Sequence, residues 1–197
     1  MRYILLLTLF CLTSSLSLSG QFFLDNASFE GKPADATIPV GWLPCELGTT
    51  PDILPGFWGV FQEASDGDTF VGLITRGDGT WESIGQRLKK TLQPKDCYSF
   101  NIDLAHSITY AGYNNPIRLR IWGGTSRCAK DQLLYETDFI KNTEWETHEV
   151  QFYIKRPINY ILIEAYYQEG RFSHQGNILI DNITQVKACP RAFLDNQ

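Results

Sequence analysis

Short runs of strand-forming residues, separated by turn signals, constrain the fold of this chain most strongly. The runs are rich in Val, Ile, Phe, Tyr and Thr and span residues 21–29, 57–63, 69–75, 82–88, 97–107, 117–123, 132–139, 145–154, 160–168 and 177–186. The segments between them are rich in Gly, Asp, Asn and Pro, which are the residues that turns require. No window repeats apolar residues at helical spacing over a helix-sized stretch. The pattern predicts an all-β sandwich or barrel of about ten strands.

The first twenty residues have the pattern of a secretory signal peptide. Arg2 precedes an apolar run from Tyr3 to Leu12, and small residues follow, so we expect cleavage after Ser19 or Gly20. The apolar run is too short to span a bilayer. We therefore expect a secreted protein that does not span a membrane and is extracellular or on the cell surface, with the periplasm as the alternative. We divide the chain into a signal peptide (1–20), one domain (21–187) and a tail (188–197).

The net charge bears on which partners the chain can bind, and the number of cysteines bears on the redox compartment in which it folds. A net charge of −5 without a Lys- or Arg-rich stripe argues against nucleic acid as a partner. Without Cys11, four cysteines remain, and an even number in an exported chain predicts two disulfides. Four cysteines allow three connectivities, of which we favour Cys97–Cys128 with Cys45–Cys189.

The stretch "IRLRIWG", residues 117–123, predicts a strand with an unusual polar face. Side chains alternate along a strand, so Ile117, Leu119 and Ile121 lie on one face. Arg118, Arg120 and Trp122 then lie on the other face, where Thr, Ser, Lys or Glu would be usual. We therefore ask what lies opposite two guanidinium groups and an indole.

Several motifs, taken in order, resemble those of a known family. They are "LDNASFEG" (24–31), "SDGDTFVGL" (65–73), "GTWESIGQRL" (79–88), "CYSFNIDLA" (97–105), "WETHEVQFYI" (145–154) and "GNILIDNI" (176–183). This order resembles CenC-type carbohydrate-binding modules and the wider galactose-binding-like jelly-roll superfamily. The segments "PGFWGV", "RLRIWGG" and "EAYY" are similar to jelly-roll domains of Bacteroidetes surface and outer-membrane proteins. The resemblance implies a jelly-roll β-sandwich of two antiparallel sheets, with ligand sites on the concave sheet or in loops at one edge.

The same alternation, applied to neighbouring strands, suggests partners for the two arginines. It puts Asp103 on the polar face of 97–107 and Glu164 and Tyr166 on that of 160–168. If these strands share a sheet, Arg118 and Arg120 meet Asp103 and Glu164, with Gln86 and Tyr166 nearby. Arginine–carboxylate pairs and flat aromatic rings are suited to sugar hydroxyls and the apolar face of a sugar ring. The alternative is a surface network of ion pairs without a ligand.

Catalysis is the weaker hypothesis for this face. Asp103 and Glu164 could act as the acid and base of a glycoside hydrolase. Adjacent arginines would keep both carboxylates ionised, however, whereas a general acid needs a raised pKa. We therefore expect a non-catalytic glycan-binding domain whose partner is a polysaccharide. The rival hypothesis is an adhesion or structural module that binds a protein of the cell envelope.

Two further sites follow from loops and from the family likeness. Trp58 and Tyr113 lie in loop segments, where they could form a stacking platform at the mouth of the glycan cleft. The alternative is that they cover the open ends of the sandwich. The resemblance also implies a structural Ca²⁺, bound by Glu30, Asp68 (or Asp66) and Asp181, since Ca²⁺ takes oxygen ligands from separate segments. The alternative is that the Asp residues of "SDGD" simply favour the turn.

Overall fold

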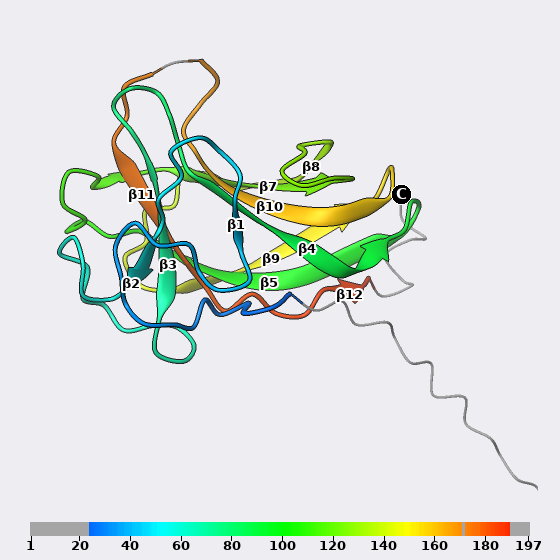
Figure 1. The fold of residues 1–197 in the computed structure, drawn as a ribbon, viewed down its shortest axis with the longest axis horizontal. Coiled ribbons are helices and arrows are strands. Elements are labelled where there is room, and N and C mark those ends of the chain that lie inside the picture. Colours follow the sequence, from blue (N-terminus) through cyan, green and yellow to red (C-terminus); the bar gives the residue numbers. More distant parts are fainter. Residues whose placement is uncertain (1–23, 171, 190–197) are drawn as a thin grey trace, which may run out of the picture.

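The computed structural model describes residues 24–170 and 172–189. The predicted signal peptide and nearly all of the tail lie outside the described residues. Within them, every regular element is a β-strand, and no helix is long and apolar enough to cross a membrane. The predicted all-β sandwich of two sheets is confirmed (Figure 1).

The strands form one five-stranded and one seven-stranded sheet. The five-stranded sheet has the order β1 (Leu43–Pro44), β4 (Ser83–Leu92), β10 (Ile158–Tyr166), β7 (Arg118–Gly124) and β8 (Gln132–Glu136). The seven-stranded sheet has the order β12 (Lys187–Ala188), β5 (Cys97–Ala105), β11 (Gly176–Asp181), β3 (Phe70–Thr75) and β2 (Asp52–Leu54), with β9 (Glu146–Tyr153) paired to β5 and β6 (Asn115–Pro116) paired to β11. All pairings are antiparallel except the short one between β6 and β11.

The core lies between the two sheets and is built by alternate residues of their strands. On β7, Leu119 and Ile121 are fully buried, whereas Arg118, Arg120 and Trp122 are partly exposed on the opposite face. The alternation predicted for this strand is therefore confirmed. The seven-stranded sheet contributes Ile102 on β5 and Ile178 on β11, whose side chains are completely buried in the same core. Burial of such aliphatic side chains supplies the main favourable free energy of folding.

A second, smaller apolar cluster covers part of the other face of the seven-stranded sheet. Leu54, Phe70, Leu179 and Tyr110 are among its fully buried members. Loops 55–64 and 107–113 lie side by side over this face, since the Ala111 N–H donates to the Trp58 carbonyl at 2.8 Å. These loops are thus held to the sheet by a core of their own.

Two of the ten predicted strands are wrong. Residues 24–29 form turns, with Asn26 at φ 49° and Phe29 at φ 55°. Residues 57–63 form a loop, with Trp58 at φ 52°. Positive φ angles are incompatible with extended backbone, so an apolar sequence does not become a strand there. Short strands β1, β2, β6 and β12 were not predicted.

Two disulfides are present, as expected, but the predicted pairing is wrong. The structure joins Cys45 to Cys128 and Cys97 to Cys189. The expected Cys97–Cys128 bridge fails because Cys97 begins β5 in one sheet, whereas Cys128 follows β7 in the other. Pairing of β12 with β5 instead brings Cys189 beside Cys97, and its N–H donates to the Cys97 carbonyl at 2.9 Å.

Candidate functional site

The outer face of the five-stranded sheet gathers most of the predicted site residues. Antiparallel pairing of β7 with β10 sets Arg118 opposite Tyr166 and Arg120 opposite Glu164. Trp122 lies two residues further along the same face. We call this surface the arginine face; its residues are Arg118, Arg120, Trp122, Glu136, Glu164, Tyr166 and Trp81. The face exists because the polar residues of β7 and β10 share one parity.

Glu136, and not Glu164, is the carboxylate that the two arginines share. Arg118 Nη1 donates to Glu136 Oε1 at 3.0 Å, and Arg120 Nε donates to Oε2 at 2.7 Å. Burial raises the pKa of Glu136, but the hydrogen bonds and charges of the two arginines outweigh it and hold the pKa below its ordinary value. Sequence reasoning missed Glu136, although Arg120 pairs directly with it across β7 and β8.

Glu164 is instead the centre of a separate buried network. Its side chain is 2 % exposed, and it accepts hydrogen bonds from Trp81 Nε1 at 2.8 Å and Trp122 Nε1 at 2.6 Å. Lys130 Nζ forms an ion pair with it at 2.5 Å. This carboxylate therefore fixes two indole rings and one ammonium group. Trp81 thereby belongs to the arginine face, although it is not among the predicted site residues.

Aromatic rings and guanidinium groups are layered across this face. The Arg120 guanidinium lies 3.3 Å from the centroid of the Tyr166 ring and 5.8 Å from that of Trp122. Trp81 meets Tyr166 edge to face, with centroids 5.8 Å apart. Arg118 lies over the Phe139 ring at 4.7 Å. Cation–π contacts of this kind hold flat groups in fixed orientations.

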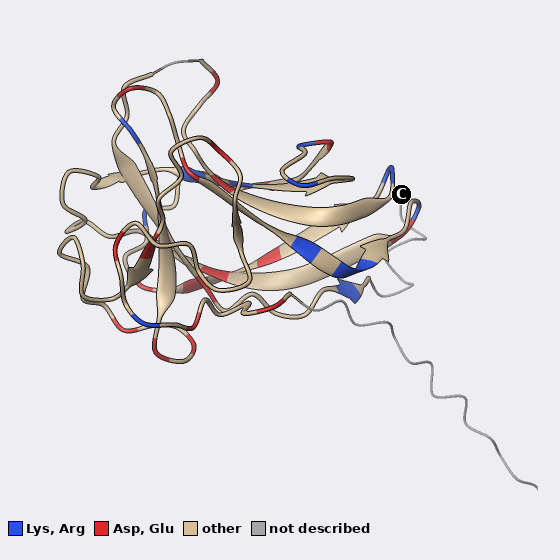
Figure 2. Cartoon of the chain, in the orientation of Figure 1, with Lys and Arg blue, Asp and Glu red and all other residues tan. Residues whose placement is uncertain are grey.

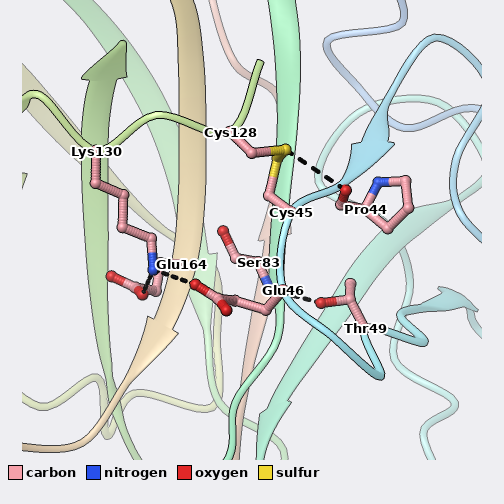
Figure 3. Close-up of a disulfide and its surroundings, with 8 residues drawn as sticks. All are labelled: Pro44, Cys45, Glu46, Thr49, Ser83, Cys128, Lys130 and Glu164. Carbon is pink, nitrogen blue, oxygen red and sulfur yellow. Dashed lines mark hydrogen bonds and ion pairs between the residues drawn. A yellow bond between two sulfur atoms is a disulfide. The ribbon is translucent and has the colours of Figure 1, made fainter. Parts of the chain in front are cut away.

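A disulfide strap covers the other part of the same sheet face. The strap consists of residues 45–50 and 125–131, joined by Cys45–Cys128 (Figure 3). Lys130 lies between Glu164 of the sheet and Glu46 of the strap, at 2.5 Å from each (Figure 3). A side chain at Gly85 would meet the Cys45 sulfur at 2.9 Å, so the strap approaches the sheet closely only because residue 85 is glycine.

A cleft opens between the strap and the neighbouring 79–81 loop. Its volume is about 270 Å³, and it is lined by Glu46, Leu47, Gly79, Thr80 and Trp81. Leu47 is 97 % exposed at its rim, which is unusual for a leucine. The cleft thus shares Trp81 with the arginine face and extends that face towards the strap.

Two predicted members do not belong to this face. Asp103 lies on β5 in the seven-stranded sheet, where its carboxylate accepts hydrogen bonds from Ser65, Thr147 and Asn182. Its neighbours Ile102 and Leu104 face the core, so Asp103 lies on the outer face at the opposite side of the sandwich from Glu164. Burial raises the pKa of Asp103, but these hydrogen bonds outweigh it and the pKa is lowered overall.

Gln86 is the second residue that the expectation misplaced. It pairs with Ile161, whose side chain is in the core, so it points inward from β4. Its side chain is buried and binds the backbone of Asp25, accepting from the N–H at 2.6 Å and donating to the carbonyl at 2.7 Å. Gln86 therefore anchors the N-terminal segment to the sheet.

Trp58 and Tyr113 do come together, but at a cavity of their own. This cavity has a volume of about 100 Å³ and is also lined by Asp52, Arg76 and Tyr110. Trp58 is 45 % exposed, whereas Tyr110 is fully buried. None of these residues lines the cleft beside Trp81. Their role in glycan stacking stays a prediction.

The residues expected to hold calcium lie around the 65–69 loop. Asp181 is fully buried and accepts the N–H groups of Ser65 and Asp66 at 2.8 and 2.9 Å. Burial raises the pKa of Asp181 to about 6, although hydrogen bonds from Asp66 and others act against it. Glu30 accepts the Asp68 N–H at 3.1 Å. These carboxylates hold the loop through its backbone, and no group of three or more His, Cys, Asp or Glu side chains in the described ranges is arranged to hold a metal ion.

The charges of the molecule are unevenly distributed. Lys and Arg gather on β4 and β12 at one end of the sandwich, whereas Asp and Glu lie mainly along β9 and on the loops at the other end (Figure 2). On the arginine face, in contrast, positive and negative side chains are held together in ion pairs. Such a surface can offer hydrogen bonds to neutral polar groups and flat rings to apolar ones.

Comparisons with known proteins identify the fold. No protein-family model matches the chain, and no curated protein matches its sequence. Solved structures match: a Stig cyclase, FisC from Fischerella sp. TAU, has a TM-score of 0.57 at 17 % identity over 87 % of this chain and 98 % of its own. The K1 cleaved adhesin domain of Lys-gingipain from Porphyromonas gingivalis W83 has a TM-score of 0.56 at 13 % identity, covering 87 % and 100 %.

A carbohydrate-binding structure is among the matches as well. The CBM22-1 xylan-binding domain of Paenibacillus barcinonensis Xyn10C has a TM-score of 0.52 at 14 % identity, covering 86 % of this chain and 95 % of its own. At such identities the likeness shows the fold alone, and it agrees with the predicted jelly-roll sandwich. The matched proteins are a cyclase, an adhesin domain and a xylan-binding domain, so the fold does not choose among functions.

Proposed function

We propose that this chain is an exported, non-catalytic glycan-binding domain of the CenC-like kind, whose ligand lies on the arginine face. One observation carries the proposal: Trp81, Trp122 and Tyr166 form a rigid aromatic set, fixed by Glu164 and Arg120, next to an open cleft of about 270 Å³. Pre-formed sites with aromatic walls and a few fixed polar groups are typical of ligand pockets. The two disulfides are consistent with export, because they persist in oxidising compartments.

The chemistry of the face is suited to a neutral sugar chain. Glu136 takes one N–H group from each of two arginines, and the guanidinium groups of Arg118 and Arg120 form no other hydrogen bond within the described residues. Arg118 Nε is buried, so the terminal N–H groups are the ones left to donate to sugar hydroxyls. Leu47 and Trp81 offer apolar surface for the C–H face of a pyranose ring.

The geometry argues against Asp103 and Glu164 as an acid–base pair. Asp103 and Glu164 lie on opposite outer faces of the sandwich, so they cannot flank one glycosidic bond. Glu164 also accepts from three donors and its side chain is only 2 % exposed, so it is buried away from any substrate on the surface.

A polysaccharide pull-down and glycan array on the mature chain test the proposal. We expect retention of a defined glycan by the wild type, and its loss in Leu47→Ser and Arg120→Gln. The matched control is Tyr153→Ser, because Tyr153 is a 42 % exposed aromatic residue on β9 in the other sheet. Thermal melts show that each variant is folded. Retention that survives both site variants would place the ligand elsewhere, and no retention by the wild type would refute glycan binding.

Adhesion to a cell-envelope protein is the second candidate, and one surface favours it. Phe61 is 75 % and Ile108 is 65 % exposed, and both line a cleft of about 220 Å³ with His106 at its wall. Exposed apolar residues gathered at one place mark interaction surfaces. A blank glycan array, together with loss of envelope binding in Phe61→Ser, would favour this function over glycan binding.

A structural calcium remains a proposal for the loop held by Glu30 and Asp181. Ser28 Oγ lies 2.8 Å from Asp66 Oδ2 and 3.1 Å from Asp181 Oδ1, so these two carboxylates are close together at the loop. Calcium that binds only the folded chain would raise its thermal midpoint, and EDTA would reverse the shift. An unchanged thermal midpoint in millimolar calcium would refute a structural calcium site.

A further inference from the structure

The cavity beside Trp58 encloses a buried carboxylate without a counter-ion. Asp52 is 5 % exposed on β2 and lines this cavity. Its oxygens accept the Ala36 N–H at 2.8 Å and the Tyr110 hydroxyl. Among the described residues, no Lys, Arg or His forms an ion pair with Asp52. Buried charges are normally paired, so this site is incomplete as a set of protein groups.

Among the described residues, Arg76 is the one cation that lines the cavity, and another group already neutralises it. Arg76 forms an ion pair with Glu82 at 2.5 Å and also donates to the Gly48 carbonyl and the Thr50 hydroxyl. Burial raises the pKa of Asp52, hydrogen bonds from Tyr110, Ala36 and Trp58 lower it, and the charge of Asp35 raises it further. Two aspartates and Glu82 thus outnumber a single arginine, and the surroundings of the cavity are net negative.

Three aromatic residues form part of the cavity wall, together with Ala36, Thr50 and Ile74. Tyr110 and Tyr113 stand nearly perpendicular, with centroids 6.2 Å apart and planes at 83°. Trp58 lines the cavity as well and stays 45 % exposed. Trp58 also holds a left-handed backbone conformation, at φ 52°, which is rare for a bulky residue and is found at functional sites.

The size of the cavity limits what can enter it. About 100 Å³ is well below the roughly 300–1,000 Å³ of sites that hold drug-sized ligands. It is room for one small group. Asp52 already accepts several hydrogen bonds, so a group that brings many N–H donors would leave some of them unsatisfied. A cation without donors avoids that cost.

We propose that Trp58, Tyr110, Tyr113 and Asp52 form a cage for a methylated ammonium group, such as the head of a quaternary amine. The faces of aromatic rings attract such cations, and aromatic cages are a known means of holding them. The carboxylate supplies the opposite charge at the floor, and the exposed Trp58 gives access from solvent. This site is distinct from the arginine face and does not depend on glycan binding there.

Tetramethylammonium chloride is the probe, with tert-butanol as a neutral group of similar size. Saturation transfer from the protein to the methyl protons of each probe measures binding without a label. We expect tetramethylammonium to bind at least about tenfold more tightly than tert-butanol, since cation–π attraction in a desolvated cage is of that size. Sodium chloride at the same concentration serves as the salt control. Equal binding of the two probes would overturn the proposal.

Two variants and one control locate the binding. Trp58→Ala removes an exposed wall, and Asp52→Asn removes the charge with little change of shape. Each should weaken tetramethylammonium binding by about tenfold or more. Phe61→Ala is the matched control, because Phe61 is an exposed aromatic residue of the same loop that does not line the cage. Thermal melts confirm folding, and Trp58→Ala remains informative if Asp52→Asn is unstable. Unchanged binding in Trp58→Ala, or equal losses in Phe61→Ala, would refute the cage.

Discussion

Replacing Glu164 by Gln tests whether the buried network under the arginine face is a structural support. The substitution keeps the size of the side chain but removes its charge, and an amide offers only one oxygen to three donors. Removing one partner of a buried ion pair costs about 3–5 kcal/mol. Lys130 is 26 % exposed and keeps Glu46, so we take the lower end, about 3 kcal/mol. For a domain of this size, that lowers the thermal midpoint by roughly 6–12 °C.

The matched control is Glu46→Gln, which removes the other carboxylate of the same lysine. Glu46 is 39 % exposed, and exposed pairs contribute about 0–1 kcal/mol. Urea unfolding followed by circular dichroism gives both free energies of unfolding, and tryptophan fluorescence reports separately on the loss of the carboxylate from Trp81 and Trp122. Similar losses below about 1 kcal/mol in the two variants would refute the reasoning, because Glu164 would then behave as a surface residue.

Three other predictions concern the rest of the fold. Replacing Cys97 and Cys189 by Ser opens a loop whose ends are 92 residues apart, which should lower the free energy of unfolding in urea by about 2–5 kcal/mol. An unchanged free energy of unfolding would mean that the disulfide does not restrict the unfolded chain. Gly124→Ala would place a methyl group against the Ala129 carbonyl, so we expect a lower thermal midpoint, and an unchanged one would show that the 125–131 loop yields. The folded-state pKa of Glu136 lies below its ordinary value of 4.5, so its contribution to stability is present above pH 4.5 and is lost as the pH falls through the folded pKa. The unfolding free energies of wild type and Glu136→Gln, measured over a pH series, should therefore diverge above that window. Parallel curves would contradict the lowered pKa of Glu136.

What the sequence predicts well is the local alternation. The division of β7 into buried Leu119 and Ile121 and polar Arg118 and Arg120 follows from side-chain period alone. The opposition of Arg120 and Glu164 also follows once β7 and β10 are neighbours. These features depend on spacing within a strand, which the sequence displays directly.

What the sequence does not predict is the pairing of distant segments. Asp103 has the expected parity on β5, but β5 belongs to the other sheet, and no local pattern states which sheet a strand joins. Glu136 was missed because its place beside Arg120 depends on the pairing of β7 with β8, which no local pattern states. The Trp58 loop was mistaken for a strand because its left-handed backbone is set by tertiary contacts.

The disulfide pairing also imposes an order on the biosynthesis of the chain. Among the four cysteines of the described residues, Cys45 and Cys97 are synthesised before either native partner, and they are not partners of each other. At roughly 5–20 residues per second, they wait for seconds before Cys128 and Cys189 are made. An oxidant that meets the nascent chain in that interval joins the wrong pair, and only thiol–disulfide exchange can then restore the native one. Correct pairing therefore depends on late oxidation or on an isomerase that exchanges the disulfides.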